Sequence, residues 1–260
     1  MKNSVISLSG GLDSTSLLIH MLNLDYHAHA ISFTYGQNHL IEVDRACRNI
    51  EYLQSQGFEN RLKHKVVDIS DAMSIISSAL TTEGAKIPEG YYEEESMRRT
   101  VVPNRNSIFA SILFGYALSI SNSTNHKTTL SLGVHSGDHA IYPDCRPEFY
   151  SSLYDAFAKG NWGSDRGEFY MPYIELDKSD ILMDAKENCT NLGINFTQVF
   201  KNTITSYSPG SDGVSDGRTG SDIERILAFH KIGEKDPIPY TEPWDKVLEH
   251  AIKIENNFKK

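Results

Sequence analysis

The chain has 260 residues, enough for one large α/β domain with a modest extension and a sizeable core. Its formal net charge of −9 argues against a surface built to grip nucleic acid, so no direct nucleic-acid binding is expected. The three cysteines have neither a disulfide spacing nor a metal-ligand spacing, and no secretory signal, lipidation motif or long apolar run is evident. We therefore expect a cytoplasmic protein without membrane attachment.

Short apolar strands alternate with longer helical patterns along the chain, as is typical of a parallel sheet covered on both faces. Strands are predicted at residues 5–8, 29–34, 63–67 and 128–134, and helices at 14–21, 40–56 and 106–121. A Ser-, Gly- and Asp-rich loop at 206–221 precedes a helix at 222–232, a turn at 236–240 and an amphipathic tail helix at 242–259. The predicted fold is α/β, doubly wound and mostly parallel, with an α/β domain over residues 1–200 and a helical extension over residues 201–260.

The first predicted strand runs into the sequence Ser-Gly-Gly-Leu-Asp-Ser at residues 9–14. Gly10 and Gly11 allow a ligand close to the backbone, Ser9 and Ser14 offer hydroxyl donors, and the following helix points its first N–H groups at the same place. This pattern predicts a phosphate site. A carboxylate facing phosphates requires a cation between them, so Asp13 is a candidate Mg²⁺ ligand. The alternative is an ordinary capped turn between a strand and a helix.

Two further segments reach the same edge of the predicted sheet, where ligands bind in such folds. Residues 33–39, Phe-Thr-Tyr-Gly-Gln-Asn-His, end the second strand with an aromatic ring and a carboxamide that suit a purine-like ring. Residues 133–138 and 142–146 follow the fourth strand. There Asp138 and Asp144 are candidates for reading donor groups of a base or positioning a nucleophile, and turn-forming aspartates are the alternative.

A basic segment, residues 98–106, leads into the helix predicted at 106–121. Pro103 restricts the backbone before the helix, and Arg105 falls at the helix start, where anions are favoured and a guanidinium group binds phosphate or carboxylate well. This arrangement indicates an anion site. The alternative is a solvated basic turn with Asn106 as the helix cap.

Taken together, these motifs resemble the 7-cyano-7-deazaguanine synthase (QueC) family of PP-loop ATP pyrophosphatases. The matching segments are 9–14, 33–37, 102–106, 133–138 and 142–146, then Met171 and Pro172 with Lys178, and Ala228 and Phe229 with Asp236 and Pro237. The resemblance implies that ATP adenylates the carboxylate of 7-carboxy-7-deazaguanine, that ammonia displaces AMP to give an amide, and that a second activation gives the nitrile. It also implies Mg²⁺ and a homodimer.

The resemblance assigns roles to the candidate residues. The expected catalytic residues are Lys178, Arg105 and Asp138. Nucleotide binding is expected at Ser9, Gly10, Gly11, Asp13, Ser14, Thr34 and Gly133. Substrate binding is expected at Tyr35, Gln37, Arg99, Asn106, Tyr142, Asp144 and Arg146. For Lys178 the alternative is a surface lysine at a helix start, and His39 and His135 are expected to be packed or hydrogen-bonding histidines.

One segment departs from the family pattern. The family's zinc site uses an isolated Cys and then a Cys-Gly-x-Cys-x-x-Cys motif, whereas the corresponding residues here are Ser206, Asp216, Thr219 and Asp222. Such oxygen groups do not replace four thiolates around zinc, so we predict no zinc site. A flexible, solvated turn is expected instead. The alternatives are a Mg²⁺ or Ca²⁺ ion held by two carboxylates of the loop, or a loop stabilised by the tail at 242–260.

The missing cysteines mark a diverged branch and leave three functions to weigh. The first is synthesis of the deazaguanine amide and nitrile. The second is an antiphage-defence (CBASS-type) enzyme that ligates the deazaguanine to a protein amine, with residues 91–95 as a receiving loop. The third, a non-catalytic nucleotide-binding module, requires broken charge-handling residues, whereas Asp13, Arg105 and Lys178 are all present.

Overall fold

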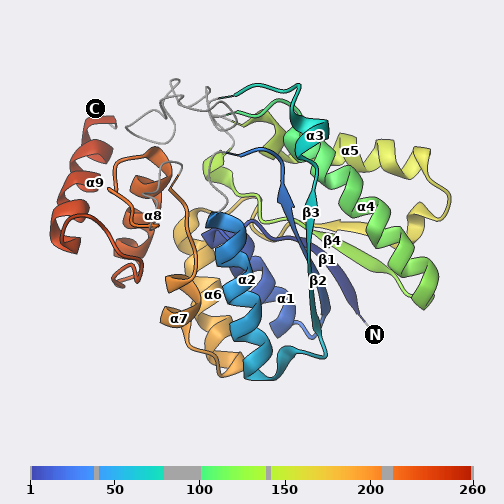
Figure 1. The fold of residues 1–260 in the computed structure, drawn as a ribbon, viewed down its shortest axis with the longest axis horizontal. Helices are drawn as coiled ribbons and strands as arrows, with labels where there is room; N and C mark the ends of the chain where they lie inside the picture. The colour runs from blue at the N-terminus through green and yellow to red at the C-terminus, as the bar shows by residue number, and fades with distance from the viewer. Residues whose placement is uncertain (1, 38–40, 79–100, 139–141, 207–212, 259–260) are drawn as a thin grey trace.

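A five-stranded parallel sheet forms the centre of the protein (Figure 1). The computed structural model describes residues 2–37, 41–78, 101–138, 142–206 and 213–258. The strands are β1 (Asn3–Ser7), β2 (His27–Thr34), β3 (Leu62–Asp68), β4 (Thr128–Ser131) and β5 (Gly167–Tyr170), in the spatial order β3-β2-β1-β4-β5. Every neighbouring pair is parallel. The prediction of an α/β fold with a parallel sheet is confirmed.

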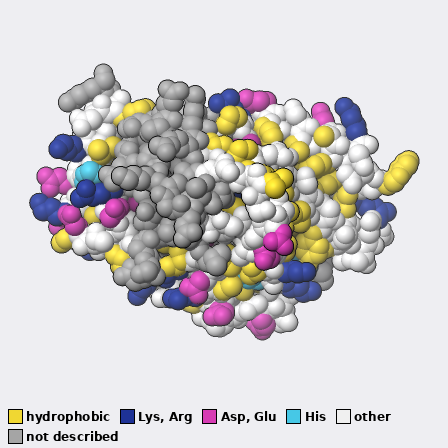
Figure 2. Space-filling model, turned by 45° about the horizontal axis from the view of Figure 1, so that its top comes forward, with side chains coloured by type: hydrophobic (Ala, Val, Ile, Leu, Met, Phe, Trp, Pro, Cys, Tyr) yellow, Lys and Arg dark blue, Asp and Glu magenta, His cyan; other side chains and the backbone are white. Residues whose placement is uncertain are grey.

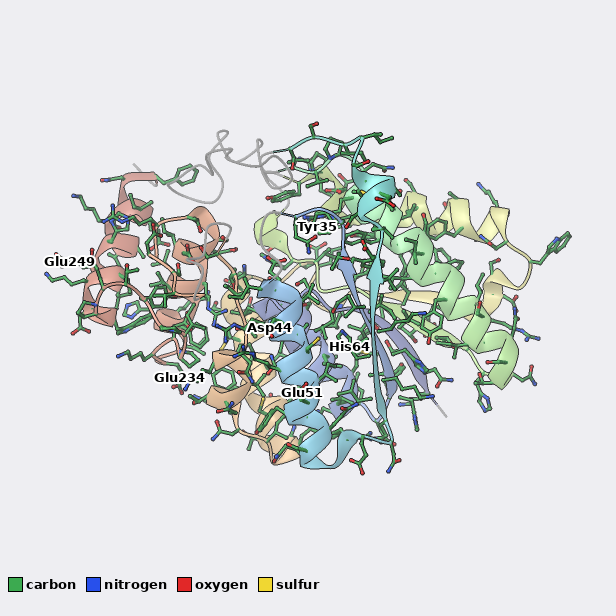
Figure 3. All side chains as sticks on the ribbon, viewed as in Figure 1. Tyr35, Asp44, Glu51, His64, Glu234 and Glu249 are labelled. Atoms are coloured by element: carbon green, nitrogen blue, oxygen red, sulfur yellow. The ribbon has the colours of Figure 1, made fainter. Side chains whose placement is uncertain are left out.

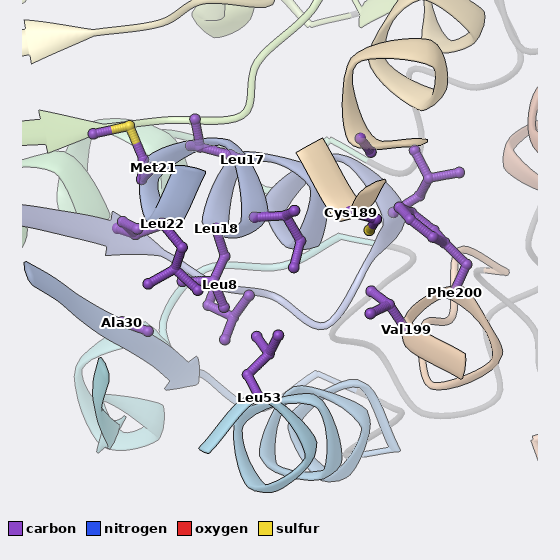
Figure 4. Packing of buried hydrophobic residues seen from close by; sticks show 14 of the residues in the cluster. Leu8, Leu17, Leu18, Met21, Leu22, Ala30, Leu53, Cys189, Val199 and Phe200 are labelled. Atoms are coloured by element: carbon purple, nitrogen blue, oxygen red, sulfur yellow. The ribbon is translucent and has the colours of Figure 1, made fainter. Parts of the chain in front are cut away.

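Alternating side chains of the strands supply two separate cores, because successive residues of a strand point to opposite faces. Ile6 and Ala30 face a core completed by α1 (Leu12–Asn23), α2 (Ile41–Leu53), α6 (Lys178–Leu192) and α7 (Phe196–Lys201) (Figure 4). Val5, Ile31 and Phe33 face the other core, under α4 (Arg105–Thr124) and α5 (Pro147–Gly160). The central strand β1 is therefore buried on both sides, which places its carboxyl end inside the protein.

The structure corrects some predicted boundaries and adds elements. The helix predicted at 40–56 ends at Leu53, and a π-helical turn, η1 (Gln54–Phe58), follows in which Gly57 has φ 96°. The strand predicted at 128–134 pairs only as far as Ser131. No element was predicted for residues 147–201 apart from a helix start near Lys178, yet they form α5, β5, α6 and α7. The short elements are α3 (Ser70–Met73), η3 (Ser136–Asp138), η4 (Pro143–Cys145) and η5 (Ser164–Arg166).

The C-terminal segment, residues 201–260, contains α8 (Gly220–Lys231) and α9 (Trp244–Phe258), which lie to one side of the sheet in Figure 1. Helix α8 packs against α6, and α9 packs on α8 through a small core of Ile223, Ile226, Val247 and Ala251. Charged side chains of both signs gather over this side of the protein (Figure 2). No helix among the described residues is long and apolar enough to cross a membrane.

A fully buried arginine fixes α8 to the rest of the protein. The Arg225 guanidinium donates to both carboxylate oxygens of Asp236, at 2.6 and 2.9 Å, and to the hydroxyls of Thr203 and Thr205. A further bond reaches the carbonyl of Phe200 in α7. Burial lowers the pKa of Arg225, but the Asp236 carboxylate outweighs it and the net pKa is raised. Arg225 therefore stays charged and holds three chain segments together.

A cluster of hydroxyl groups around one carboxylate stands in the segment that lacks the family's cysteines. The Asp222 carboxylate accepts hydrogen bonds from Ser206 (2.9 Å), Ser215 (2.8 Å) and Thr219 (2.5 Å), and we call these four residues the Asp222 cluster. Burial raises the pKa of Asp222, and the three hydroxyl donors oppose that shift. Asp216, also assigned to a cysteine position, is exposed and accepts from the N–H of Arg218 instead.

The expectation of a solvated turn is wrong for the Asp222 cluster, since all four of its residues are buried. The three hydroxyl donors satisfy the buried carboxylate and so offset the free-energy cost of burying it. The tail contributes as well: Val247 of α9 packs against Gly217, and Glu242 lies 3.8 Å from Arg218. Just before the tail, Ser215 pairs with Tyr240 and its carbonyl accepts from the N–H of Thr241. Contacts between the tail and the loop agree with the alternative of stabilisation by residues 242–260.

Candidate active site

A cavity of about 270 Å³ opens at the carboxyl edge of the sheet, between the end of β1 and the starts of α1, α4 and α6. Ten of the residues expected in the site line it: Ser9, Gly11, Asp13, Ser14, Tyr35, Gln37, Arg105, Asn106, Gly133 and Lys178. These residues come from distant chain segments, since Ser9 and Lys178 are 169 positions apart in the sequence. The fold thus brings the predicted phosphate loop and the predicted base-binding segments to one place.

The loop between β1 and α1 is shaped by its own hydroxyl groups. The Ser9 N–H donates to Ser14 Oγ (3.1 Å), the two serine hydroxyls lie 3.0 Å apart, and the Gly11 N–H donates to Ser9 Oγ (3.2 Å). Helix α1 begins after Gly11, which offers no side chain to cap it. Within the described residues, no side-chain cap bonds the first N–H groups of α1 beside the cavity, and such a helix start favours a bound anion.

Two glycines let neighbouring elements approach this loop. Gly10 has φ 88°, and a Cβ there would lie 2.0 Å from the carbonyl oxygen of Glu42 in α2. A Cβ on Gly133 would lie 3.1 Å from the carbonyl oxygen of Asp13. Gly133 lines the cavity, whereas Gly10 lies behind the wall and serves the packing of α2.

Asp13 and Lys178 lie side by side in the cavity wall. Asp13 Oδ2 lies 3.5 Å from Lys178 Nζ and 3.7 Å from His135 Nε2, and Lys178 Nζ also donates to Glu224 Oε2 at 2.6 Å. Lys178 is only 5% exposed, so the alternative of a surface lysine is wrong. His135 is buried and accepts from the N–H of Gly137, which agrees with the prediction of a hydrogen-bonding histidine.

The start of α6 places Lys178. Asp177 caps the helix through a capping box with Asp180, so Lys178 is the first helical residue. Burial opposes ionisation of Asp177, but hydrogen bonds from Lys231, Ser179 and Asp180 lower its pKa to about 2. The cap therefore remains ionised at neutral pH and fixes the direction in which the Lys178 side chain leaves the helix.

Asp13 also has an oxygen that suits a metal ion. Its Oδ1 is buried and has no hydrogen-bond partner in the part of the chain that the structure describes. Mg²⁺ takes such carboxylate oxygens and completes its shell with water and substrate phosphates. Among the described residues, no group of three or more His, Cys, Asp or Glu side chains is arranged to hold a metal. Asp13 thus fits as a single protein ligand whose partners come from a bound nucleotide.

The other wall of the cavity is aromatic and basic. Asn104, in the left-handed conformation with φ 60°, immediately precedes α4, and Arg105 Nη1 donates to the Tyr35 hydroxyl at 3.4 Å. The Gln37 carboxamide accepts from the N–H of Tyr35 (2.8 Å) and donates to the carbonyl of Phe33 (3.2 Å). Gln37 therefore braces its own loop and sets the position of Tyr35, in addition to lining the cavity.

Several expected site residues are not among the described lining residues of the cavity. Thr34 points toward the edge strand, where its hydroxyl bonds to Asp68. Around η4, Cys145 lines the cavity and contacts the Asn106 amide at 3.5 Å, whereas Tyr142, Asp144 and Arg146 are not among the lining residues. Arg99, His39, residues 91–95 and the side chain of Asp138 lie outside the described part of the chain.

Two glutamates of the site were missed by sequence reasoning. Glu42 of α2 lines the cavity and is half-buried, and Glu224 of α8 contacts Lys178. Burial raises the pKa of Glu42 to about 7, although Arg105 acts in the opposite direction. In the sequence, the one indication that Glu42 belongs to the site is its position five residues after Gln37. Glu224 had no signal, because its partner is 46 residues away in the sequence.

The raised pKa of Glu42 predicts a pH-dependent stability. The Glu42 carboxyl loses its proton near pH 4.5 in the unfolded chain and near pH 7 in the folded protein. The contribution of protonated Glu42 to the free energy of unfolding is therefore full below pH 4.5 and is lost as the pH rises through about 7. Between about pH 5 and about pH 8, the unfolding free energy of wild type should fall by about 1–3 kcal/mol relative to Glu42→Gln.

Urea denaturation at several pH values measures this difference. Glu51→Gln, at an exposed position of the same helix (Figure 3), is the control for a neutralised glutamate on α2. Stability curves of wild type and Glu42→Gln that stay parallel over this pH range contradict the prediction.

The parallel sheet, the hydroxyl-rich glycine loop before α1 and the paired Asp13 and Lys178 define an ATP-using enzyme of the PP-loop type. Residues 3–233 match the family described as Queuosine biosynthesis protein QueC. The chain belongs to this family, as its motifs indicated, and it is an ATP-dependent carbon–nitrogen ligase. Helix α9 lies beyond the matched residues.

Curated relatives cover almost the whole chain. A 7-cyano-7-deazaguanine synthase of Caldicellulosiruptor saccharolyticus is 40% identical over 237 residues, which are 91% of this chain and 95% of the relative. One from Methanoregula boonei is 38% identical over 237 residues, 91% of this chain and 98% of the relative. Among solved structures, the NMN synthetase from Francisella tularensis is 16% identical with a TM-score of 0.40, covering 98% of this chain and 84% of that chain.

Proposed function

We propose that the protein uses ATP to activate the carboxylate of 7-carboxy-7-deazaguanine and ligates nitrogen to it, giving the amide and then the nitrile. One observation carries the proposal: the glycine loop at 9–14 and the wall formed by Tyr35, Arg105 and Asn106 share a single cavity with Lys178. A reaction between a nucleotide phosphate and the carboxylate of a flat heterocycle requires that proximity. The names of the curated relatives support the same substrate.

The charged groups of the cavity suit adenylation. The carboxylate of the acid attacks the α-phosphate of ATP, pyrophosphate leaves, and a mixed anhydride with AMP forms. Negative charge crowds together in this step, and Lys178 and Arg105 are the cationic side chains of the described wall that offset it. The N–H groups at the start of α1, with Ser9 and Ser14, receive the departing pyrophosphate.

Asp13 would hold Mg²⁺ through its buried Oδ1. When bound, the ion screens the phosphate charges and orients them. His135 Nε2 and Lys178 Nζ lie 3.7 and 3.5 Å from Oδ2 of the same carboxylate and hold it beside the cavity. The protein contributes electrostatics and positioning here, without a covalent intermediate of its own.

The aromatic wall suits the heterocycle. Phe33 stacks on Phe109 with ring centroids 4.2 Å apart, and Tyr35 meets Phe109 edge to face. Both Phe33 and Tyr35 line the cavity, so a flat ring would find an apolar surface there with the Asn106 amide beside it. The 7-carboxylate would then be directed toward Arg105.

One observation favours testing a second acceptor. Ser206 and Ser221 line the cavity, and they belong to the segment that lacks the family's cysteines. The divergent segment therefore borders the reaction site. Ligation of the activated deazaguanine to a protein amine, as in an antiphage-defence enzyme, uses the same first step and changes only the nucleophile.

The test combines purified protein with ATP, Mg²⁺, 7-carboxy-7-deazaguanine and ammonium, with pyrophosphate release followed and the products weighed by mass spectrometry. The proposal expects pyrophosphate release that depends on the acid, followed by amide and nitrile. Pyrophosphate release without amide or nitrile directs the search to protein amines, starting with polypeptides encoded nearby. No acid-dependent pyrophosphate release refutes the proposal and favours a module that only binds nucleotide.

We also propose that residues 1–200 and 201–260 act as an α/β domain and an extension, and that the protein works as a cytoplasmic homodimer. Cys47, Cys145 and Cys189 form no disulfide in the described structure, in keeping with a reducing compartment. Sedimentation analysis tests the dimer.

A further inference from the structure

Glu224 of α8 reaches into the active site from the C-terminal segment. Its Oε2 accepts a hydrogen bond from Lys178 Nζ at 2.6 Å, and Lys178 is 5% exposed. Its Oε1 lies close to Gly137, because a Cβ built on that glycine would be 2.4 Å from this oxygen. Glu224 thus fills the space between the start of α6 and the turn η3 that follows β4.

The helix that carries Glu224 is anchored immediately on both sides of it. Two residues earlier, Asp222 is held by three hydroxyl donors, and one residue later, Arg225 is held by Asp236. All of these anchors are buried. Helix α8 therefore has little freedom to rotate or slide, and the Glu224 carboxylate occupies a fixed position.

Lys178 needs such a fixed partner. A lysine carries a compact charge on a flexible stem, and Asp13, the other described carboxylate near its Nζ, lies 3.5 Å away. If Lys178 turned fully toward Asp13, it would occupy the oxygens that a cation requires and leave the space of the phosphates.

We propose that Glu224 is a positioning residue for nucleotide activation, which holds the Lys178 ammonium group at the cavity wall and keeps it from pairing fully with Asp13. The inference rests on the proposed function, and it extends the active site to α8. The C-terminal segment then acts on the reaction through a single carboxylate. This positioning role gives a reason for the buried anchors that fix the C-terminal segment, although the segment lies apart from the sheet.

The test compares Glu224→Gln, Glu224→Asp and Glu234→Gln. Glu234 is the matched control, because it lies just after α8, pairs with Lys186 of α6 and is solvent-accessible, away from Tyr35 of the cavity (Figure 3). For Glu224→Gln we expect about a five- to tenfold rise in the calorimetric Kd for Mg·ATP and at least about a tenfold fall in kcat for pyrophosphate release. Glu224→Asp keeps the charge and should remain within about threefold of wild type, and Glu234→Gln within about twofold.

A double-mutant cycle separates positioning from general loosening of the fold. If Glu224 acts through Lys178, Glu224→Gln adds nothing in a Lys178→Gln background. Additive effects in that cycle, an unchanged Kd and kcat for Glu224→Gln, or an equal loss for Glu234→Gln would each overturn the inference. If wild type binds Mg·ATP but releases no pyrophosphate with the acid, the proposed function fails, while the calorimetric comparison still decides the role of Glu224.

Discussion

Replacing Asp13 with asparagine is expected to slow pyrophosphate release by about 10²–10³-fold, the range found when one electrostatic contact to a reacting group is lost. Asparagine keeps the size of the side chain and removes its charge. Oδ1 of Asp13 is buried without a hydrogen-bond partner among the described residues, so its charge is available to a cation. The amide oxygen is a much weaker ligand for Mg²⁺, and the buried Lys178 loses one of its carboxylate neighbours.

Titration of the rate with Mg²⁺ measures this effect. The Asp13→Asn protein should need much more Mg²⁺ for half-maximal rate and should not recover full activity at saturation. Asp245→Asn, an exposed aspartate in the first turn of α9, makes the same chemical change outside the cavity and should leave the titration unchanged. An Asp13→Asn enzyme that regains the wild-type rate in excess Mg²⁺ would show that the carboxylate serves only for affinity, and one unaffected at any Mg²⁺ concentration would exclude Asp13 as a ligand.

The second large effect is expected on stability. Arg225→Met should lower the free energy of unfolding by about 3–5 kcal/mol, because it leaves Asp236 as a buried carboxylate without its bidentate partner. The substitution also removes the donors to Thr203, Thr205 and the Phe200 carbonyl, which join α8 to the end of α7. The substitution should therefore destabilise the whole C-terminal segment as well as the surroundings of residue 225.

Chemical denaturation of the whole chain measures this change. Arg218→Met is the control, since Arg218 is half exposed and lies 3.8 Å from Glu242, an ion pair of the kind worth about 0–1 kcal/mol. The double variant Arg225→Met with Asp236→Leu removes both charges and should recover part of the lost stability. Equal stability of Arg225→Met and wild type would mean that the buried pair contributes nothing net.

The positions that the resemblance assigns to the family's cysteines lie in the C-terminal segment. Three of the four positions assigned to the family's cysteines, Ser206, Thr219 and Asp222, still converge, joined by Ser215. A carboxylate with three hydroxyl donors is a smaller and weaker junction than a metal with four thiolates. The contacts of α9 and the Arg225–Asp236 pair supplement it, so several modest interactions hold the segment.

The amino-acid sequence by itself determined the parallel α/β class, the glycine loop at 9–14 and ten of the residues that line the cavity. These features depend on local patterns, since buried strands are short apolar runs and a glycine turn before a helix marks a phosphate site. The sequence did not identify β5, whose four residues carry too little pattern, the approach of Gly10 to α2 or the hydrogen bond of Thr34 to Asp68. Tertiary structure alone decided the burial of Lys178, the raised pKa of Glu42 and the arrival of Glu224 beside them. Burial and electrostatic pairing depend on which segments meet in space, and no local pattern records a neighbour 46 residues away.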